Sequence, residues 1–373
     1  MKLTIISHTE HYQTTDGIIV GWGPTINELN YLTKIFDEIV HIAMLHPTSP
    51  PQSALPYTSA KIKFVPLPVL GGKTMGSKLK TIFNSAKVIS IVKRELKTTD
   101  VFQLRTPTGI GVFLIPYLTL FVKKKGWYKY AGNWNQENPP LGYRLQRWIL
   151  KRQRRIVTVN GFWKNQPKNI IAFENPCLTE EDRGKGQAII KNKKHTGNIN
   201  YCFVGGLNTN KGIDKIVDAF KGIETVDIGT FHIVGDGVLR KSIEEKTKEL
   251  SFNCVVHGSL PKEQVVEIYK QSHFVILPSL SEGFPKVIGE AMNYGCVPIV
   301  SDVSCIGQYV IEGINGFLIN PITIDEIKKT IERSLNISDK SFETYLKENY
   351  KRATIFTYDY YIKQIQNKII QKN

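Results

Sequence analysis

Short runs of β-branched and aromatic residues alternate with amphipathic, helix-length segments along the whole chain. Strands that alternate with helices build βαβ units, in which parallel strands are covered by helices on both faces. Strand candidates in the first half are residues 2–7, 38–45, 61–68, 101–105, 127–132 and 155–160, and in the second half residues 200–206, 230–236, 254–258, 274–279, 297–302 and 316–320. The pattern therefore predicts an α/β protein with doubly wound, Rossmann-like parallel sheets.

The chain has 373 residues, too many for one ordinary hydrophobic core and suited to two domains of about 150 to 200 residues each. We expect a first domain at residues 1–176 and a second at residues 199–354. The segment between them, residues 177–198, is polar, rich in Gly and Lys, and without convincing periodicity. It is predicted to be a linker.

Positive charge is concentrated in the first half, where residues 1–177 hold 24 Lys and Arg against 9 Asp and Glu. In three segments, 77–97, 123–129 and 144–155, these cations alternate with Leu, Ile, Phe and Trp. The mixture suits an anionic membrane surface, although a solvated basic face is the plainer alternative. No zinc-finger, ribonucleoprotein or helix-turn-helix pattern accompanies the charge, so no nucleic-acid partner is expected.

The five cysteines are scattered and have no CxxC spacing, which indicates neither a disulfide framework nor a zinc site. The apolar run at residues 110–122 is too short to span a bilayer. The N-terminal residues show no signal-peptide pattern. We expect a cytoplasmic protein, with peripheral contact to the inner face of the cytoplasmic membrane.

Candidate ligand-binding residues follow the strands of the second half, because open parallel sheets bind ligands beyond the carboxyl ends of their strands. The loop within residues 203–212 contains Gly205, Gly206 and Lys211, which suit phosphate oxygens, although a plain glycine turn explains the glycines equally well. At residues 234–240 a GxG pattern lacks the third glycine of a dinucleotide fingerprint and is consistent with a strand-to-helix turn.

A third strand end holds Gly258 and Leu260, in a loop whose backbone can face a flat base. The fourth holds Glu282 in a loop and Glu290 on the helix that Pro285 begins. On one straight helix these acids would lie roughly 80° apart, so the loop position lets both face one elongated ligand. Alternatively, Glu290 is an ordinary helix-surface acid and Glu282 a first-turn acid favoured by the helix dipole. The N–H groups available to phosphate at this helix start belong to Gly283, Phe284 and Lys286.

Residues 201–319 resemble the nucleotide-sugar-binding domain of retaining GT-B glycosyltransferases, family 4. The resemblance is carried by "YCFVGGLNTNKG", "HIVGDGVLR", "VVHGSL" and a Glu-x7-Glu signature in "PSLSEGFPKVIGEAMNYG". The first half matches only in outline, through a glycine-containing loop after its first strand, with Gly21 and Gly23 as donor-binding residues, and a strand end at residues 100–109.

This resemblance implies two facing Rossmann-like domains with a cleft between them, the donor on the second and the acceptor on the first. A helix at about residues 355–371 would pack back on the first domain. The implied reaction moves a hexose-type sugar from a nucleotide-diphosphate sugar with retention. No cofactor is expected, and no metal, because no Asp-x-Asp motif is present.

The resemblance also implies roles for individual residues. Glu290 would accept hydrogen bonds from ribose hydroxyls, Glu282 would contact the transferred sugar, and Lys211 would neutralise the leaving diphosphate. The family usually has Arg at the position of Gly206 and often His-x-His where this chain has Gln103 and Arg105. We therefore hypothesise a catalytic role for Arg105 at the diphosphate or an anionic acceptor, the alternative being a local ion pair. Candidate acceptor contacts are Asn133 and Trp134.

The implied acceptor is a glycan or lipid-linked sugar in bacterial surface polysaccharide assembly, such as capsule or O-antigen. Two alternatives remain open. A nucleotide-sugar epimerase on the same fold would act without an acceptor. A catalytically degenerate sugar-nucleotide-binding subunit would bind donor without turnover.

Overall fold

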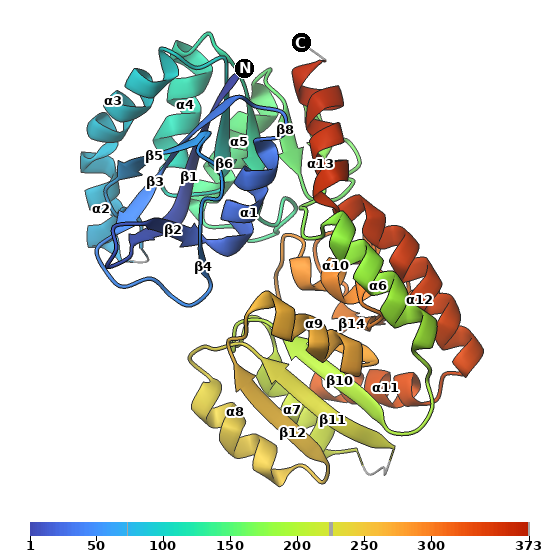
Figure 1. Ribbon diagram of the computed structural model, residues 1–373. Helices are drawn as coiled ribbons and strands as arrows, with labels where there is room; N and C mark the ends of the chain where they lie inside the picture. Colours follow the sequence, from blue (N-terminus) through green and yellow to red (C-terminus); the bar gives the residue numbers. More distant parts are fainter. Residues whose placement is uncertain (73, 224–226, 372–373) are drawn as a thin grey trace. The chain divides into compact units, whose positions relative to one another are not determined.

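The computed structural model describes residues 1–72, 74–223 and 227–371 of the chain (Figure 1). It divides into two compact units. The first comprises Met1–Glu174 together with the C-terminal segment that begins at Tyr361, and the second comprises Asn175–Tyr360.

The first unit is built on a sheet whose main strands are parallel and run in the order β5-β3-β1-β6-β7-β8-β9. Two short strands extend this sheet: β2 pairs antiparallel with the end of β1, and β4 pairs antiparallel with β2. The strands are β1 (Lys2–Gln13), β2 (Ile19–Trp22), β3 (Glu38–His46), β4 (Ala54–Pro56), β5 (Ile62–Leu67), β6 (Val101–Thr106), β7 (Lys125–Tyr130), β8 (Val157–Val159) and β9 (Ile170–Ala172).

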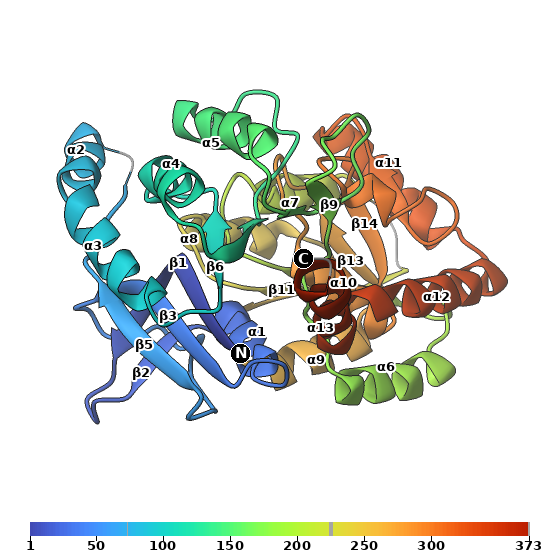
Figure 2. The ribbon, with the colours of Figure 1, turned by 90° about the horizontal axis from the view of Figure 1, so that it is seen from above.

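Helices cover both faces of this sheet. They are α1 (Gly23–Leu32), α2 (Met75–Phe83), α3 (Ser85–Leu96), α4 (Gly111–Phe121), α5 (Leu141–Arg152) and α13 (Tyr358–Ile365), which a π-helical turn at Gln366–Ile370 continues. On one face Val88, Leu114 and Leu150 of α3, α4 and α5 join the strand residues in one core. On the other face α1 packs with Tyr361 and Ile365 of the C-terminal segment. Figure 2 shows α3, α4 and α5 on one side of the strands and α1 on the other.

The expected glycine loop after the first strand is instead a strand. Residues 14–18 turn the chain, with Gly17 at φ +81°, and β2 returns antiparallel to β1 so that Gly21 faces His11. A β-carbon on Gly21 would stand 2.5 Å from the His11 imidazole, which explains the glycine by close packing. Gly23 begins α1. The β-branched residues around position 19 favour this strand, so the loop prediction for this segment was wrong.

The apolar run at residues 110–122 forms helix α4 and buries Leu114, Ile115 and Leu118 in the core of the first unit. This helix therefore packs on the sheet of the first unit. None of the helices in the described part of the chain is both long enough and apolar enough to cross a membrane.

The second unit has a fully parallel sheet in the order β12-β11-β10-β13-β14-β15. Its strands are β10 (Ile199–Val204), β11 (Ile228–Val234), β12 (Asn253–Gly258), β13 (Phe274–Leu277), β14 (Val297–Ser301) and β15 (Phe317–Ile319). The helices are α6 (Glu180–Asn192), α7 (Ile213–Lys221), α8 (Arg240–Lys246), α9 (Lys262–Gln271), α10 (Lys286–Asn293), α11 (Ile324–Leu335) and α12 (Asp339–Ala353). The winding direction reverses between β10 and β13, as in Rossmann sheets.

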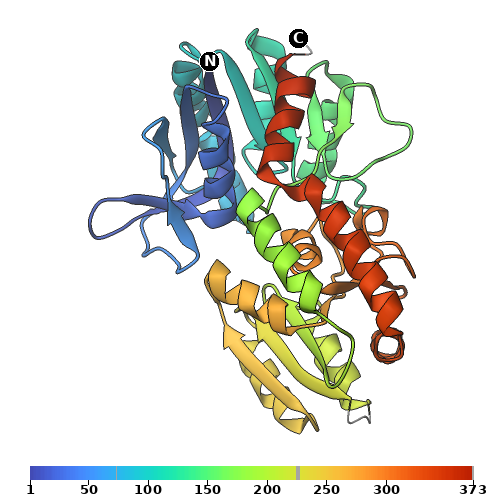
Figure 3. The same cartoon turned by 45° about the vertical axis from the view of Figure 1, so that its right-hand side comes forward.

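The predicted linker at residues 177–198 is largely helix α6 and belongs to the second unit. A capping box starts it, because the Asp182 N–H donates to the Thr179 hydroxyl (3.0 Å) and the Thr179 N–H donates to the Asp182 carboxylate (2.8 Å). The buried Arg183 then donates to Asn293 Oδ1 at 2.7 Å. Figure 3 shows α6 beside α12. The linker prediction was wrong, because it relied on the polar composition of this segment. The helix start signal, Thr-x-x-Asp, was present in the sequence.

Candidate active site

The loops that follow β10 and β13 are joined at the point where the sheet of the second unit reverses direction. The Leu280 N–H donates to the Asn210 carbonyl at 2.8 Å, and the Asn210 side chain donates to the Ser281 carbonyl at 3.1 Å. Gly212 has φ +71°, and a β-carbon there would stand 2.7 Å from the Pro278 carbonyl oxygen. Only glycine fits at that crossing. Two segments far apart in sequence are thereby held together.

Lys211 and Glu282, one from each of these loops, form an ion pair. Their side chains are 23% and 11% exposed, so the pair is largely shielded from water while remaining reachable. The Lys211 main-chain N–H is held by the Asn208 side chain at 3.1 Å. An ammonium has three donors, so Lys211 can bind Glu282 and a phosphate oxygen together, and the second carboxylate oxygen of Glu282 remains an acceptor for a hydroxyl.

The neighbouring GxG segment is a strand-to-helix turn that supports the Gly205 loop. The Gly205 N–H donates to the Val234 carbonyl at 3.0 Å. Gly235 adopts φ +136°, and a β-carbon there would stand only 1.9 Å from the Gly205 carbonyl oxygen. These glycines permit two backbones to touch, which agrees with the turn alternative of the sequence analysis.

Gly206 leaves open space beside this loop. A β-carbon built on it would meet the side-chain amide of Asn208 at 3.0 Å and next the Asp236 carbonyl oxygen at 3.9 Å. A β-carbon at this position therefore requires only a small shift of the Asn208 side chain. The glycine is not demanded by the backbone at this position.

The third predicted strand end is held against the same loops. Gly258 ends β12 at φ +71°, and its carbonyl accepts from the Gly235 N–H at 2.8 Å. Leu260 follows it and is half-buried. Arg240 places its guanidinium 3.1 Å from the β-position of Gly258 and pairs with Asp236 at 3.0 Å. Sequence reasoning missed this cation, although it lies in the helix start that follows the GxG turn.

Helix α10 begins at Lys286, and Pro285 is its N-cap rather than its first helical residue. The Phe284 ring is buried, stacks on Phe356 and lies at a tilt against Tyr309, with 4.7 Å between ring centroids in both cases. This ring anchors the loop and does not face a ligand. Within residues 1–72, 74–223 and 227–371, the amide N–H groups of Gly283 and Phe284 find no acceptor, so they remain available to an anion at this helix start.

Glu290 lies further along α10 and is half-buried instead of facing bulk water. The Tyr269 hydroxyl donates to its carboxylate at 3.4 Å. Burial raises the pKa of Glu290, while the positive charges of Lys262 and Lys286 oppose that rise. A half-buried carboxylate with one long hydrogen bond has spare capacity to accept ligand hydroxyls.

This raised pKa predicts a pH-dependent gain in stability when Glu290 is replaced. The folded protein binds the Glu290 proton more tightly than the unfolded chain, so ionisation of this group opposes folding. The cost is absent below the ordinary glutamate pKa and complete above the raised one. We expect Glu290→Gln to raise Tm at about pH 8 and to lose that advantage toward about pH 4. Glu343→Gln, an exposed acid on α12, is the control and should change Tm at neither pH.

In the first unit, the predicted catalytic Arg105 is bound to local partners. Its guanidinium donates to Glu28 at 2.8 Å, to Thr25 at 3.2 Å and to Gln103 at 3.0 Å. Its side chain is 12% exposed. The local ion pair that the sequence analysis kept as an alternative is therefore formed, and contact of Arg105 with a ligand stays a prediction.

The predicted acceptor residues Asn133 and Trp134 follow β7. The Trp134 ring is buried against Tyr130, and its Nε1–H donates to Gln166 at 3.1 Å. Asn133 accepts from the Asn135 N–H at 3.0 Å and so shapes the turn. The indole is thus a core group that Tyr130 and Gln166 enclose, and contact of Asn133 or Trp134 with an acceptor stays a prediction.

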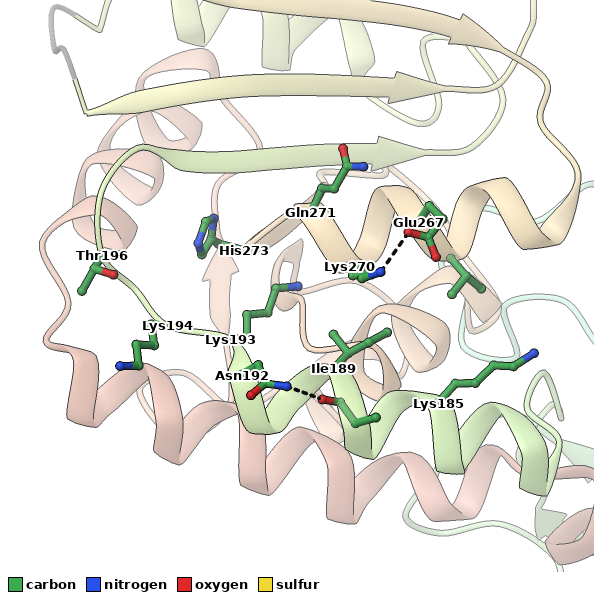
Figure 4. A pocket seen from close by; sticks show the side chains of 12 residues that line it. Lys185, Ile189, Asn192, Lys193, Lys194, Thr196, Glu267, Lys270, Gln271 and His273 are labelled. Carbon is green, nitrogen blue, oxygen red and sulfur yellow. Dashed lines mark hydrogen bonds and ion pairs between the residues drawn. The ribbon is translucent and has the colours of Figure 1, made fainter.

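A cavity of about 840 Å³ lies elsewhere in the second unit, between α6 and α9 (Figure 4). It is lined by Lys185 and Ile189 of α6, by Glu267 and Lys270 of α9, and by His273, which directly precedes β13. It therefore opens near the amino end of β13. None of the residues predicted to bind the donor lines it. Because ligands of such sheets bind at the carboxyl ends, we place the candidate active site at the Lys211–Glu282 pair.

Over its whole length the chain is similar to the solved lipopolysaccharide outer core galactosyltransferase WaaB in its apo form, with a TM-score of 0.68 and 18% sequence identity, covering 100% of both chains. Two doubly wound units with such a neighbour identify the GT-B fold. Residues 185–353 match the family model described as glycosyl transferases group 1. The match covers 169 of the 373 residues and lies within the second unit.

Curated relatives are similar to part of the chain. An uncharacterized glycosyltransferase of Methanocaldococcus jannaschii is 30% identical over 202 residues, which is 54% of this chain and 55% of the relative. A lipopolysaccharide 1,2-N-acetylglucosaminetransferase of Salmonella typhimurium is 29% identical over 145 residues, which is 36% of this chain and 38% of the relative. The match thus spans about half the length of the first relative and less of the second.

Proposed function

We propose that this protein is a glycosyltransferase that moves a sugar from a nucleotide-diphosphate sugar to a glycan or lipid-linked acceptor. The observation that carries the proposal is the Lys211–Glu282 pair at the reversal point of a parallel sheet. That sheet lies in the unit that matches the glycosyl transferases group 1 model. A cation and an acid at this edge suit the two ends of a sugar diphosphate.

The chemistry of transfer accounts for these residues. Positive charge develops at the sugar and negative charge on the departing phosphate, and groups already aimed at those positions lower the barrier. Lys211, together with the amides of Gly283 and Phe284 at the start of α10, would hold the phosphates. Glu282 would bind sugar hydroxyls and Glu290 the ribose. We propose retention at the anomeric carbon, as the resemblance to family 4 implies, with protein cations in place of a divalent metal.

The acceptor we propose is a surface polysaccharide or its lipid-linked precursor. One relative is named as a lipopolysaccharide transferase, and the basic, apolar segments of the first unit suit a membrane-bound acceptor. The protein would then act at the inner face of the cytoplasmic membrane, as a lipopolysaccharide or capsule enzyme.

A thermal-shift screen with UDP-, GDP- and ADP-sugars tests the donor side. A ligand that binds only the folded state, present at 100 times its Kd, stabilises by about 2.7 kcal/mol, which corresponds to about 5 to 10 °C for a unit of this size. We expect one base to give such a shift. Incubation of that donor with candidate acceptors, followed by NMR of the new anomeric centre, then reads the product and its configuration.

Each alternative predicts a different result in these assays. Formation of an epimer from donor alone would favour an epimerase. Donor binding without hydrolysis or transfer to any acceptor would favour a degenerate binding subunit. Absence of a shift with every nucleotide sugar would contradict the proposed function itself.

A further inference from the structure

Helix α5 of the first unit carries bulky apolar side chains on its solvent side. Leu141, Leu145 and Trp148 follow one face of the helix and are 72%, 42% and 53% exposed. The opposite face carries Gln146 and Leu150, both fully buried. An ordinary surface helix turns its apolar stripe to the core and its polar face to water. Here the largest apolar groups lie on the outside.

Two further helices of the same layer repeat this feature. On α2, Leu79, Ile82 and Phe83 are spaced as one helical face, and Phe83 is 82% exposed. At the end of α4, Leu120 and Phe121 are 73% and 75% exposed. Isolated exposed apolar residues need no explanation, but three neighbouring helices that each present them form a patch.

Helix α5 lies against the start of α4, and the segment just before α4 lies against α2. A β-carbon on Gly142 of α5 would stand 3.4 Å from Val112 of α4, and one on Gly109, just before α4, would stand 3.8 Å from Thr81 of α2. Figure 2 shows α2, α4 and α5 on the same side of the strands of the first unit. We call the exposed apolar side chains of α2, α4 and α5 the outer helix face.

Cations surround the outer helix face. The segments that contain it, residues 74–97 and 111–155, hold sixteen Lys and Arg but only two acids, Glu95 and Glu137, and one of these cations, Lys129, is buried against Glu28. On α5 the exposed Arg144, Lys151 and Arg152 flank the apolar stripe, and the Arg152 guanidinium lies 4.6 Å from the Trp148 ring centroid. Three exposed lysines, Lys123, Lys124 and Lys125, follow Phe121.

We propose that the outer helix face docks on an anionic lipid bilayer. Its Leu, Phe and Trp side chains would enter the boundary between headgroups and acyl chains, while its Lys and Arg would bind lipid phosphates. A second copy of this chain fits poorly, because two faces with the same large positive charge repel each other. Nucleic acid also fits poorly as the partner of this face, because its phosphates would bind the cations but would leave the exposed Leu and Phe side chains without apolar contacts. This docking concerns the membrane side of the proposed function and does not require catalysis.

Vesicle co-sedimentation of the full chain tests the docking. We expect strong binding to vesicles of phosphatidylcholine with phosphatidylglycerol at low salt, weaker binding at high salt, and little binding to phosphatidylcholine alone. The triple variant Leu141→Ser, Leu145→Ser and Trp148→Ser should lower partitioning about tenfold or more. The triple variant Arg144→Gln, Lys151→Gln and Arg152→Gln should do the same on anionic vesicles.

Matched variants on the second unit provide controls. The double variant Val238→Ser and Ile314→Ser removes exposed apolar groups. The double variant Lys328→Gln and Lys347→Gln removes exposed cations. Neither double variant should alter binding to vesicles. The proposal is overturned if wild-type protein ignores anionic vesicles at low salt, or if the α5 variants bind them as wild type does. A lipid surface would also be rejected if wild-type protein formed a dimer that the α5 variants lose. It would likewise be rejected if RNA competed equally with the vesicles for the protein. If the α5 variants show the same thermal shift with donor as wild type, their loss of vesicle binding is independent of donor binding and of the proposed transfer.

Discussion

Replacing Lys211 with methionine is expected to slow sugar transfer about 100- to 1,000-fold, the loss seen when one preorganised group is removed from a developing oxyanion. Methionine retains the length of the side chain and removes the ammonium that would meet the leaving diphosphate. Because the charge on the phosphate grows as the bond to the sugar breaks, kcat should fall more than donor affinity. Steady-state kinetics with the donor identified by thermal shift provide the measurement.

The control is Lys221→Met, at the far end of α7. Lys221 also pairs with an acid, Glu249, at 2.8 Å, so this variant removes an ion pair from the same region without touching the candidate site. It should retain wild-type kcat. Since Lys211→Met leaves the Glu282 carboxylate without its ammonium partner, the double variant Lys211→Met with Glu282→Gln serves as a check on folding. A kcat for Lys211→Met within threefold of wild type, with Tm unchanged, would remove Lys211 from the mechanism.

The architecture of this protein could be predicted from its sequence because hydrophobic runs of strand length alternate with helical periods from end to end. The residues of the candidate site could also be predicted, since strand ends are where parallel sheets bind ligands. The pairing of Lys211 with Glu282 could not. It requires β10 and β13 to be neighbours, which is a matter of strand order and connects residues 71 positions apart.

The packing around two of the predicted residues could not be derived from the sequence. Trp134 follows a strand as a ligand-binding residue would, but Tyr130 and Gln166 enclose it. The Arg105 guanidinium meets Glu28 from α1, 77 positions away, which is the local ion pair that the sequence analysis kept as an alternative. Neither packing partner can be read from the local pattern. The wrong linker prediction for α6 has another cause. The capping signal was present in the sequence, but the polar composition of the segment was given more weight.

Replacing Glu28 with glutamine is expected to destabilise the first unit by about 3 to 5 kcal/mol, the usual cost of removing one partner from a buried ion pair. The Glu28 side chain is 3% exposed, and its carboxylate accepts from Lys129 at 2.8 Å, Arg105 at 2.8 Å and the Tyr361 hydroxyl at 2.6 Å. Glutamine has nearly the same shape but no charge. Two buried cations would then lose the only acid that these contacts supply.

The effect should be concentrated where the C-terminal segment meets the sheet, because Tyr361 joins Glu28 from that segment. Differential scanning calorimetry should show the transition of the first unit moving down by about 6 to 20 °C, with the second unit little changed. Hydrogen exchange should accelerate first in α1 and after Tyr361. Glu38→Gln is the matched control, since Glu38 pairs with Lys2 at 2.7 Å but is 47% exposed, and should cost no more than about 0.5 kcal/mol. Equal shifts in the two variants would mean that the buried network around Glu28 contributes no more to stability than one surface ion pair.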